Sequence, residues 1–231
     1  MPPPENAPDY SGSDDYMVGA APVGRYNFGD NRYVELLGNY ASANIVNSQN
    51  WRFGPAVQYR FGRKDVDDPV VDRMSDVDGA LQAGATFGYN YHFNNDIRHR
   101  AGVGIDVLQD VEGDKGLSAT AYARYWVPVS RAVDVGLSGS VVYGSDDFND
   151  TYYGISASDS LASGLSAYNA DSGINAYRIM PMAMLHLSEQ WHIGAGVRWE
   201  RLTGDAADSP IVSERGDENQ IAGGLGLIYA W

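Results

Sequence analysis

The fold class is most easily inferred from Asn219-Gln-Ile-Ala-Gly-Gly-Leu-Gly-Leu-Ile-Tyr-Ala-Trp231. Every second residue from Ile221 is apolar or glycine, the row ends in Tyr229 and Trp231, and the intervening residues are mostly small. A terminal strand with one apolar face and an aromatic last side chain is typical of an outer-membrane β-barrel. We expect Tyr229 and Trp231 to close the barrel and to be recognised by the barrel-assembly machinery. The alternative is an edge strand of a soluble β-sandwich.

Composition limits the classes of protein that remain. The chain has 231 residues, which suits one large all-β domain, and no cysteine, so neither a disulfide framework nor a thiolate metal site is available. The net charge of −14 repels phosphate backbones, so we expect no nucleic-acid partner. The apolar runs fall short of the roughly 18 residues of a membrane helix, although barrel strands hide their apolar residues at alternate positions.

The same alternation of apolar and polar residues recurs upstream. It is clearest over residues 51–61, where Trp51, Phe53 and Val57 alternate with polar or small residues. Ten segments show the pattern: 16–28, 32–46, 51–61, 80–93, 97–109, 116–127, 131–143, 175–188, 191–203 and 219–231. Each is long enough to cross a bilayer at a tilt. We therefore predict a flexible amino-terminal segment over 1–15 and a single transmembrane barrel domain over 16–231.

Loop lengths support an antiparallel transmembrane β-barrel of about ten strands. Tight turns are expected at 47–50, 94–96, 128–130 and 189–190, and long loops at 62–79, 144–174 and 204–218, with smaller ones at 29–31 and 110–115. With the carboxyl terminus in the periplasm, every tight turn is periplasmic and every long loop faces outward. An even strand number also brings both ends of the barrel to one side.

These patterns predict a location in the bacterial outer membrane, in contact with lipid and lipopolysaccharide. Met1-Pro-Pro-Pro4 has no signal-peptide character, so for an exported protein we expect the processed form. The acidic residues of the long loops are interpreted as solvated charges, with divalent cations shared with lipopolysaccharide as the alternative.

The polar rows of the strands should face the lumen. They carry Arg25, Glu35, Arg52, Arg60, Asp106, Arg124, Asp134, Arg178, Arg198 and Glu200. One interpretation is a mutually paired network that fills a narrow barrel. The other is a conduit with a basic constriction that favours small anionic or zwitterionic solutes.

The four histidines should lie near the periplasmic rim, at strand ends. They are His92, His99, His186 and His192. Because the strands of the first two are not adjacent to the strands of the last two, we interpret them as rim residues at interfacial depth, with a metal or catalytic cluster as the alternative. We expect no metal and no cofactor.

Several loop motifs resemble the MltA-interacting protein family (MipA/OmpV). They are Pro8-Asp-Tyr-Ser-Gly-Ser-Asp-Asp-Tyr16, Tyr153-Gly-Ile-Ser156, Ser163-Gly-Leu-Ser-Ala-Tyr168 and Leu202-Thr-Gly-Asp-Ala-Ala-Asp-Ser-Pro-Ile-Val212. The last is the most specific, through Gly204, Asp205, Asp208, Ser209 and Pro210. The resemblance implies an outer-membrane scaffold for peptidoglycan machinery, with a membrane-bound lytic transglycosylase and a bifunctional penicillin-binding protein as partners. It carries over no catalytic residues.

Three functions follow from these observations. The first is a non-enzymatic scaffold that docks periplasmic partners by its rim and residues 1–15. The second is a narrow porin-like channel with an arginine-rich lumen. The third, a barrel enzyme acting on lipid, requires a nucleophile and base at lipid depth. The chain offers no Ser–His pairing towards the outer leaflet, so we predict that it is not an enzyme.

Overall fold

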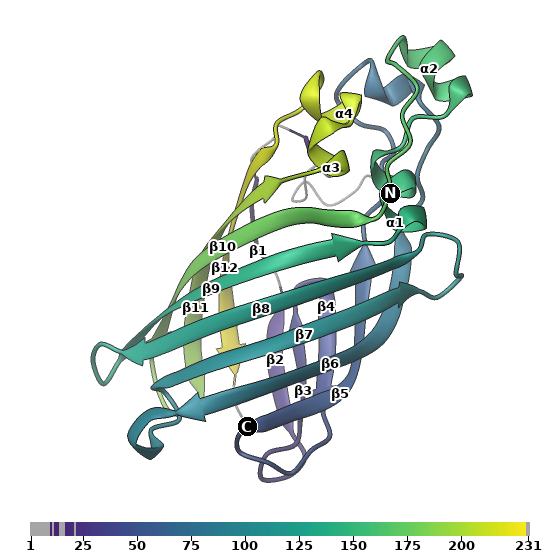
Figure 1. Ribbon diagram of the computed structural model, residues 1–231. Helices are drawn as coiled ribbons and strands as arrows, with labels where there is room; N and C mark the ends of the chain where they lie inside the picture. Colours follow the sequence, from purple (N-terminus) through teal and green to yellow (C-terminus); the bar gives the residue numbers. More distant parts are fainter. Residues whose placement is uncertain (1–9, 11, 14–16, 21, 230–231) are drawn as a thin grey trace.

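A single sheet curls into a barrel with helices gathered at one end (Figure 1). The computed structural model describes residues 10, 12–13, 17–20 and 22–229. Its strands are β1 Met17–Ala20, β2 Val23–Asn27, β3 Tyr33–Leu37, β4 Tyr40–Asn44, β5 Trp51–Arg60, β6 Ala80–His92, β7 Arg100–Asp110, β8 Leu117–Pro128, β9 Val133–Gly144, β10 Gly173–His186, β11 Trp191–Leu202 and β12 Asn219–Tyr229. The helices are α1 Asp146–Tyr153, α2 Ala157–Ser163, α3 Asp205–Asp208 and α4 Pro210–Ser213, with 3-10 turns η1 Val71–Arg73 and η2 Phe93–Asn95.

The barrel has eleven antiparallel strands, β2 to β12, so the prediction of about ten was wrong by one strand. The predicted strand 32–46 is a hairpin of β3 and β4, in which Leu37 pairs with Tyr40. Gly38, at the turn, has a φ of 63°, a left-handed conformation that glycine adopts without a steric penalty. The alternating pattern runs through this glycine without showing that the chain reverses there.

The odd strand number changes how the barrel closes. The predicted strand 16–28 is divided into β1, which pairs with β12, and β2, which pairs with β3. In an up-and-down sheet of eleven strands the first and last run the same way. The β1–β12 ladder is accordingly parallel, over Met17–Ala20 and Ala222–Leu225, and the expectation of an even number was wrong.

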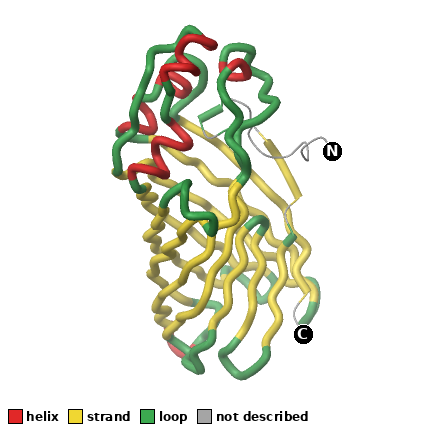
Figure 2. Tube along the Cα trace, turned by 90° about the vertical axis from the view of Figure 1, so that its right-hand side faces the viewer, coloured by secondary structure: helices red, strands yellow, loops and turns green. Residues whose placement is uncertain are grey.

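The extra strand also moves one turn to the other end of the barrel. The turn at 28–32 lies beside the 45–50 turn, because Asn44 Nδ2 donates to Asn31 O at 2.6 Å and Asn31 Nδ2 donates to Asn47 Oδ1 at 3.0 Å. It therefore belongs to the short-turn end, not with the long loops as predicted. The remaining long loops do gather at the opposite end, as Figures 1 and 2 show.

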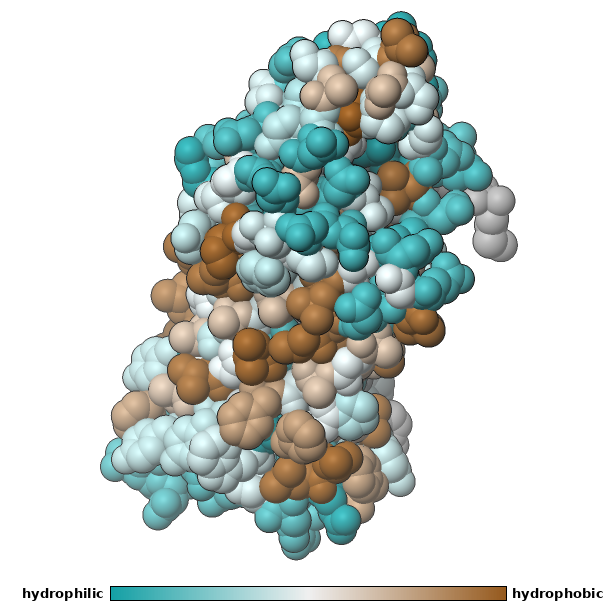
Figure 3. Space-filling model, turned by 45° about the vertical axis from the view of Figure 1, so that its right-hand side comes forward, coloured by the Kyte–Doolittle hydropathy of each residue, from teal (hydrophilic) through white to brown (hydrophobic). Residues whose placement is uncertain are grey.

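The outer wall of the barrel is apolar. Along β5 the odd-numbered side chains are exposed, whereas Arg52, Gly54 and Ala56 are buried. Hydrophobic residues cover much of the wall in Figure 3, and the cap above it is mainly hydrophilic. Near the short-turn end aromatic rings pair across strands, as in Trp191 and Tyr229 at 4.8 Å. Trp231, the other predicted closing residue, lies outside the described residues.

None of the described helices has the length and apolar character needed to cross a membrane. The helices instead form, with the loops at 61–79, 145–172 and 203–218, a compact structure that we call the cap. The large hydrophobic core lies here, with Phe148, Ile155, Leu202, Ile211 and Val212 at its centre.

The amino-terminal residues that the structure describes are part of this cap. Tyr10 belongs to its core, and the Tyr10 hydroxyl donates to Arg215 O at 3.2 Å. Gly12 O accepts from the amide of Asp217 at 2.9 Å, and Ser13 O accepts from Gln220 Nε2 at 2.9 Å. The segment predicted to be flexible is therefore anchored at the long-loop end at these three positions.

Candidate functional site

Polar side chains opposite the apolar wall meet in the lumen, and the first cluster centres on Glu35. Arg25 on β2 and Glu35 on β3 are register partners and form an ion pair. Arg52 Nη1 on β5 lies 3.9 Å from Glu35 Oε1, and the Arg52 guanidinium donates to the Tyr122 hydroxyl on β8. Both Glu35 and Arg52 are buried. Three predicted lumen residues are thus brought together.

The second cluster centres on Glu200 of β11. Its register partner, Arg178 of β10, forms an ion pair with it. Glu200 also interacts electrostatically with Arg198 of its own strand and with Arg60 of β5. Since β5 lies halfway around the barrel from β10 and β11, Arg60 acts on this carboxylate electrostatically from the opposite wall, without a direct contact.

Aromatic rings contact most of the inward arginines, and sequence analysis did not assign them this role. The guanidinium-to-ring distances are 4.0 Å for Arg25 and Tyr33, 4.3 Å for Arg124 and Tyr122, 4.6 Å for Arg60 and Phe148, and 5.5 Å for Arg100 and Trp126. Such cation–π contacts stabilise guanidinium charges, both in Arg25, which also pairs with Glu35, and in Arg60, Arg100 and Arg124, which form no ion pair among the described residues. Tyr122 and Trp126 could have been found, because they lie on the polar row of their strand.

Asp106 lies inside the barrel on β7, apart from these pairs. Its Oδ1 atom is buried and has no hydrogen-bond partner among the described residues. The predicted pairing of Asp106 with a lumen arginine is therefore not seen as a direct contact in the part of the chain that is described.

Asp134 lies at the short-turn rim. Its Oδ1 accepts from Arg98 at 2.9 and 2.5 Å, and its Oδ2 lies 2.9 Å from His186 Nε2. His186 Nδ1 is in turn 2.9 Å from His192 Nδ1. Sequence analysis assigned Asp134 to the lumen network and missed this chain of contacts.

The other histidines are not part of that chain of contacts. His99 Nε2 lies 2.7 Å from the Tyr125 hydroxyl, on the outer side of the barrel. Among the described residues, no group of three or more histidine, cysteine, aspartate or glutamate side chains is placed to hold a metal ion.

Helix α1 covers the long-loop end of the lumen. It begins after Ser145, whose hydroxyl accepts from the Phe148 amide, and Asn149 Oδ1 accepts from Asn175 Nδ2 of β10 at 2.7 Å. From the opposite wall, Arg60 lies 4.6 Å from the Phe148 ring and 5.1 Å from the Tyr152 ring. Helix α1 thus connects two opposite sides of the barrel mouth.

The predicted family motif builds part of the cap. Gly204, with a φ of 55°, precedes α3, and Asp205 Oδ2 accepts from the Asp171 amide at 2.7 Å. Ser209 is fully buried, and its hydroxyl donates to Tyr153 O at 2.6 Å. Asp208 ends α3 and Pro210 begins α4. The motif joins the β11–β12 loop to α1.

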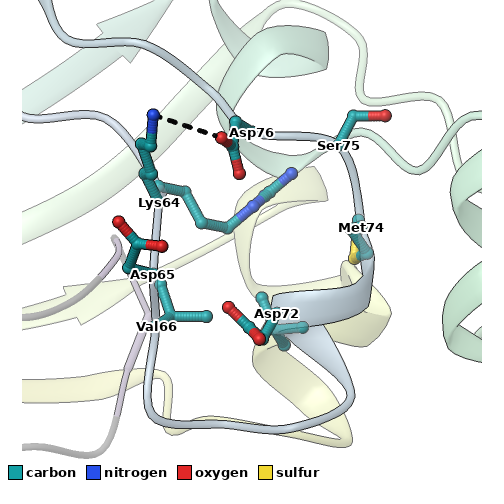
Figure 4. A pocket seen from close by; sticks show the side chains of 9 residues that line it. Lys64, Asp65, Val66, Asp72, Met74, Ser75 and Asp76 are labelled. Carbon is teal, nitrogen blue, oxygen red and sulfur yellow. Dashed lines mark ion pairs between the residues drawn. The ribbon is translucent and has the colours of Figure 1, made fainter.

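A small pocket in the β5–β6 loop is lined by acidic and basic side chains (Figure 4). Lys64 Nζ lies 3.6 Å from Asp76 Oδ2, and Asp65 and Asp72 face the same space. The pocket is too narrow to hold a water molecule, so it is part of the packing of the loop.

Two acidic loop residues are hydrogen-bonded within the cap. Asp159 Oδ1 accepts from the Ser75 amide at 2.7 Å, which joins α2 to the β5–β6 loop. Asp68 Oδ2 accepts from Arg215 Nη2 at 2.5 Å, which joins that loop to the β11–β12 loop. The interpretation of the acidic loop residues as solvated charges is wrong for these two.

An apolar wall, a charged lumen and short turns opposite long loops define an outer-membrane β-barrel protein. The whole chain then identifies the family. Residues 4–231 match the family described as "MltA-interacting protein MipA", so the chain belongs to this family.

The relatives agree with this assignment. The chain is 26% identical over 207 residues to the MltA-interacting protein of Escherichia coli K12, covering 87% of this chain and 78% of the relative, with the same values for the protein of Shigella flexneri. It is 27% identical over 152 residues to "Putative outer membrane protein YiaT" of Escherichia coli K12, covering 66% and 58%. The predicted family and outer-membrane location are confirmed, and membership supports an adaptor role at family level.

Proposed function

We propose that the protein is a non-enzymatic adaptor that docks a peptidoglycan-remodelling enzyme on its short-turn rim. The observation that carries this proposal is the match to the MltA-interacting protein family over residues 4–231. A lytic transglycosylase is the first partner to test, and a bifunctional penicillin-binding protein the second. In outer-membrane barrels the short turns face the periplasm, where these enzymes act.

The state of the lumen supports a function at the surface. Glu35, Arg52 and Glu200 are buried in paired clusters, and α1 lies over the long-loop mouth. The porin-like alternative requires an open path past these groups. The arginine-rich lumen fits that alternative, but the paired clusters of the described strands leave it no better supported than the adaptor.

The described amino-terminal residues also favour the short-turn rim as the docking face. Tyr10, Gly12 and Ser13 are fixed in the cap, at the end opposite the short turns. These three residues lie too far from the short turns to contribute to a periplasmic surface, so the proposal rests on the turns.

Arg98 joins two of these turns into one surface. Its guanidinium donates to Ser130 O at 2.8 Å and to Arg131 O at 3.2 Å, in addition to its contacts with Asp134. Beside it, Ile97 and Val129 are exposed by 63% and 58%. Arginine is enriched at binding hot spots, and exposed aliphatic side chains beside it lose apolar surface to water when a partner docks. We call the surface formed by residues 96–98 and 129–131 the rim platform.

The test is binding of a purified lytic transglycosylase to the folded barrel in detergent micelles, by biolayer interferometry. The double variant Ile97→Asp with Arg131→Glu should weaken binding at least tenfold. The control is Leu161→Asp in α2, where the leucine is 89% exposed at the opposite end. Wild-type affinity in the rim variant would overturn the proposal, provided that heat-dependent gel mobility shows the barrel to be folded.

A further inference from the structure

The lumen holds more positive than negative charge. Between the two rims, the inward arginines are Arg25, Arg52, Arg60, Arg100, Arg124, Arg178 and Arg198, and the inward carboxylates are Glu35, Asp106 and Glu200. Asp134, at the short-turn rim, is bound by Arg98. Asp110, at the long-loop end, accepts through Oδ2 from the Gly113 and Lys115 amides, whereas its Oδ1 is buried with no partner among the described residues. Buried charge requires compensation by opposite charge or hydrogen bonds. With Asp110 counted among the carboxylates, three of the seven guanidinium charges have no carboxylate to balance them.

Aromatic rings and backbone carbonyl oxygens compensate part of this buried positive charge. Arg124 and Arg60 lie over aromatic rings, and Arg100 also donates to Ile97 O at 2.8 Å. Arg198 differs from the others. Within the described residues, no ion pair, hydrogen bond or ring contact involves its guanidinium, and its electrostatic neighbours are Glu200, Arg178 and Arg60.

The three guanidinium groups and Glu200 together carry a charge of +2, and Asp110, the register partner of Gln82, is the next carboxylate at this end of the lumen. Next to them, Gln82 of β6 is fully buried, and its Oε1 accepts from Arg60 Nε at 3.5 Å. The Gln82 Nε2 donor is buried and has no partner in the part of the chain that is described. The Arg198 guanidinium and the Gln82 Nε2 donor flank the same cluster. A bound anion would accept hydrogen bonds from both.

We propose that the lumen binds a small oxyanion at the cluster of Arg60, Arg178 and Arg198, beneath α1. A guanidinium group presents a planar pair of donors that matches the oxygens of phosphate or carboxylate. This site is independent of the rim platform and of the adaptor function.

The test uses inorganic phosphate and thermal unfolding of the folded protein in non-ionic detergent micelles. Ionic strength is held constant by replacing chloride with phosphate. A ligand that binds only the folded state raises the midpoint temperature, and the rise follows the logarithm of its concentration above Kd. We expect this rise in the wild type. An identical midpoint in chloride alone and in phosphate would overturn the proposal, because it would indicate only screening.

Three variants locate the site. Arg198→Gln should weaken phosphate binding at least tenfold, and Glu200→Gln should strengthen it, because the carboxylate that competes for the arginines is removed. Arg73→Gln, in the exposed η1 turn of the cap, should bind as the wild type does. Unchanged phosphate affinity in Arg198→Gln would overturn the proposal. If Glu200→Gln does not fold, as judged by heat-dependent gel mobility, the Arg198→Gln titration alone gives the answer.

Discussion

Gly12 illustrates how single residues fix the amino-terminal segment. Its φ is +105°, and a Cβ atom placed there would lie 2.5 Å from Val212 Cγ2 in the core of the cap. Two penalties therefore act on any other residue: left-handed backbone strain and a collision with a buried side chain. The carbonyl of Gly12 also accepts from the Asp217 amide, so a shift of the backbone would break this bond.

Gly12→Ala should lower the free energy of unfolding of the cap by roughly 2–4 kcal/mol. Gly113→Ala is the matched control. Gly113 also has a positive φ, of +88°, but its Cβ would meet nothing within 4 Å, so only the cost of about 1 kcal/mol for the backbone remains. Urea unfolding followed by tyrosine fluorescence measures both values. Equal losses would mean that the contact with Val212 does not matter.

Ser209 tests whether the family motif is structural. Its buried hydroxyl donates to Tyr153 O, so Ser209→Ala leaves that carbonyl without this donor and should cost about 1–3 kcal/mol of cap stability. Because the motif lies in the cap, binding to a lytic transglycosylase should not change. The exposed Ser172→Ala provides the control. Weaker partner binding without a loss of stability would assign the motif a direct role in recognition.

At the scale of elements, carboxylates join the loops of the cap. Burial alone would raise the pKa of Asp159, but hydrogen bonds from the Ser75 amide and the Ser156 hydroxyl lower it below the ordinary value. Burial alone would likewise raise the pKa of Asp68, but hydrogen bonds from Arg215 and two backbone amides lower it. A carboxyl with a lowered pKa stabilises the fold above its unfolded value of about 4, and this contribution is lost as the pH falls through the folded value.

The cap should therefore be stable at neutral pH and open below a pH of about 4, before the barrel unfolds. Limited digestion with pepsin between pH 2 and 4 should cleave the loops at 61–79 and 145–172 first, while heat-dependent mobility still reports an intact barrel. Asp159→Asn should make cleavage less dependent on pH. A cleavage rate that rises no faster than that of an unfolded substrate would contradict this expectation.

At the scale of the whole molecule, the wall should be sensitive to charge and the lumen should be closed. Val103, on the outer face of β7, is 57% exposed and lies in the middle of the strand. Val103→Lys should cost about 2–4 kcal/mol in a bilayer if it lies near the midplane. Lysine in place of the exposed Val111, in the β7–β8 turn, should cost little. Equal costs, measured by unfolding from lipid vesicles, would argue against this placement of the wall.

A planar bilayer tests closure of the lumen directly. The folded wild type should show no steady openings, because paired side chains fill the lumen and α1 covers one mouth. Replacement of residues 146–153 by a Gly-Ser linker should remove Phe148 and Tyr152 from Arg60 and permit brief openings. Reproducible single-channel conductance in the wild type would instead support the channel alternative.

Period-two alternation was sufficient to predict a barrel, its wall and its lumen face. The reason is that each strand displays its own pattern locally, as Trp51, Phe53 and Val57 do. The resemblance of loop motifs supplied the family. Neither pattern depends on contacts between distant parts of the chain, so both can be read from short stretches.

The strand number, the closure of the barrel and the contacts of the cap and rim depend on long-range contacts. The hairpin at Gly38 sets the strand number, because alternation continues across a reversal of the chain. The parallel β1–β12 closure, the anchoring of Tyr10 in the cap and the approach of Asp134 to His186 all join residues far apart in sequence. Their energies come from packing and hydrogen bonds that exist only once the barrel has closed, which is why no local pattern in the sequence predicts them.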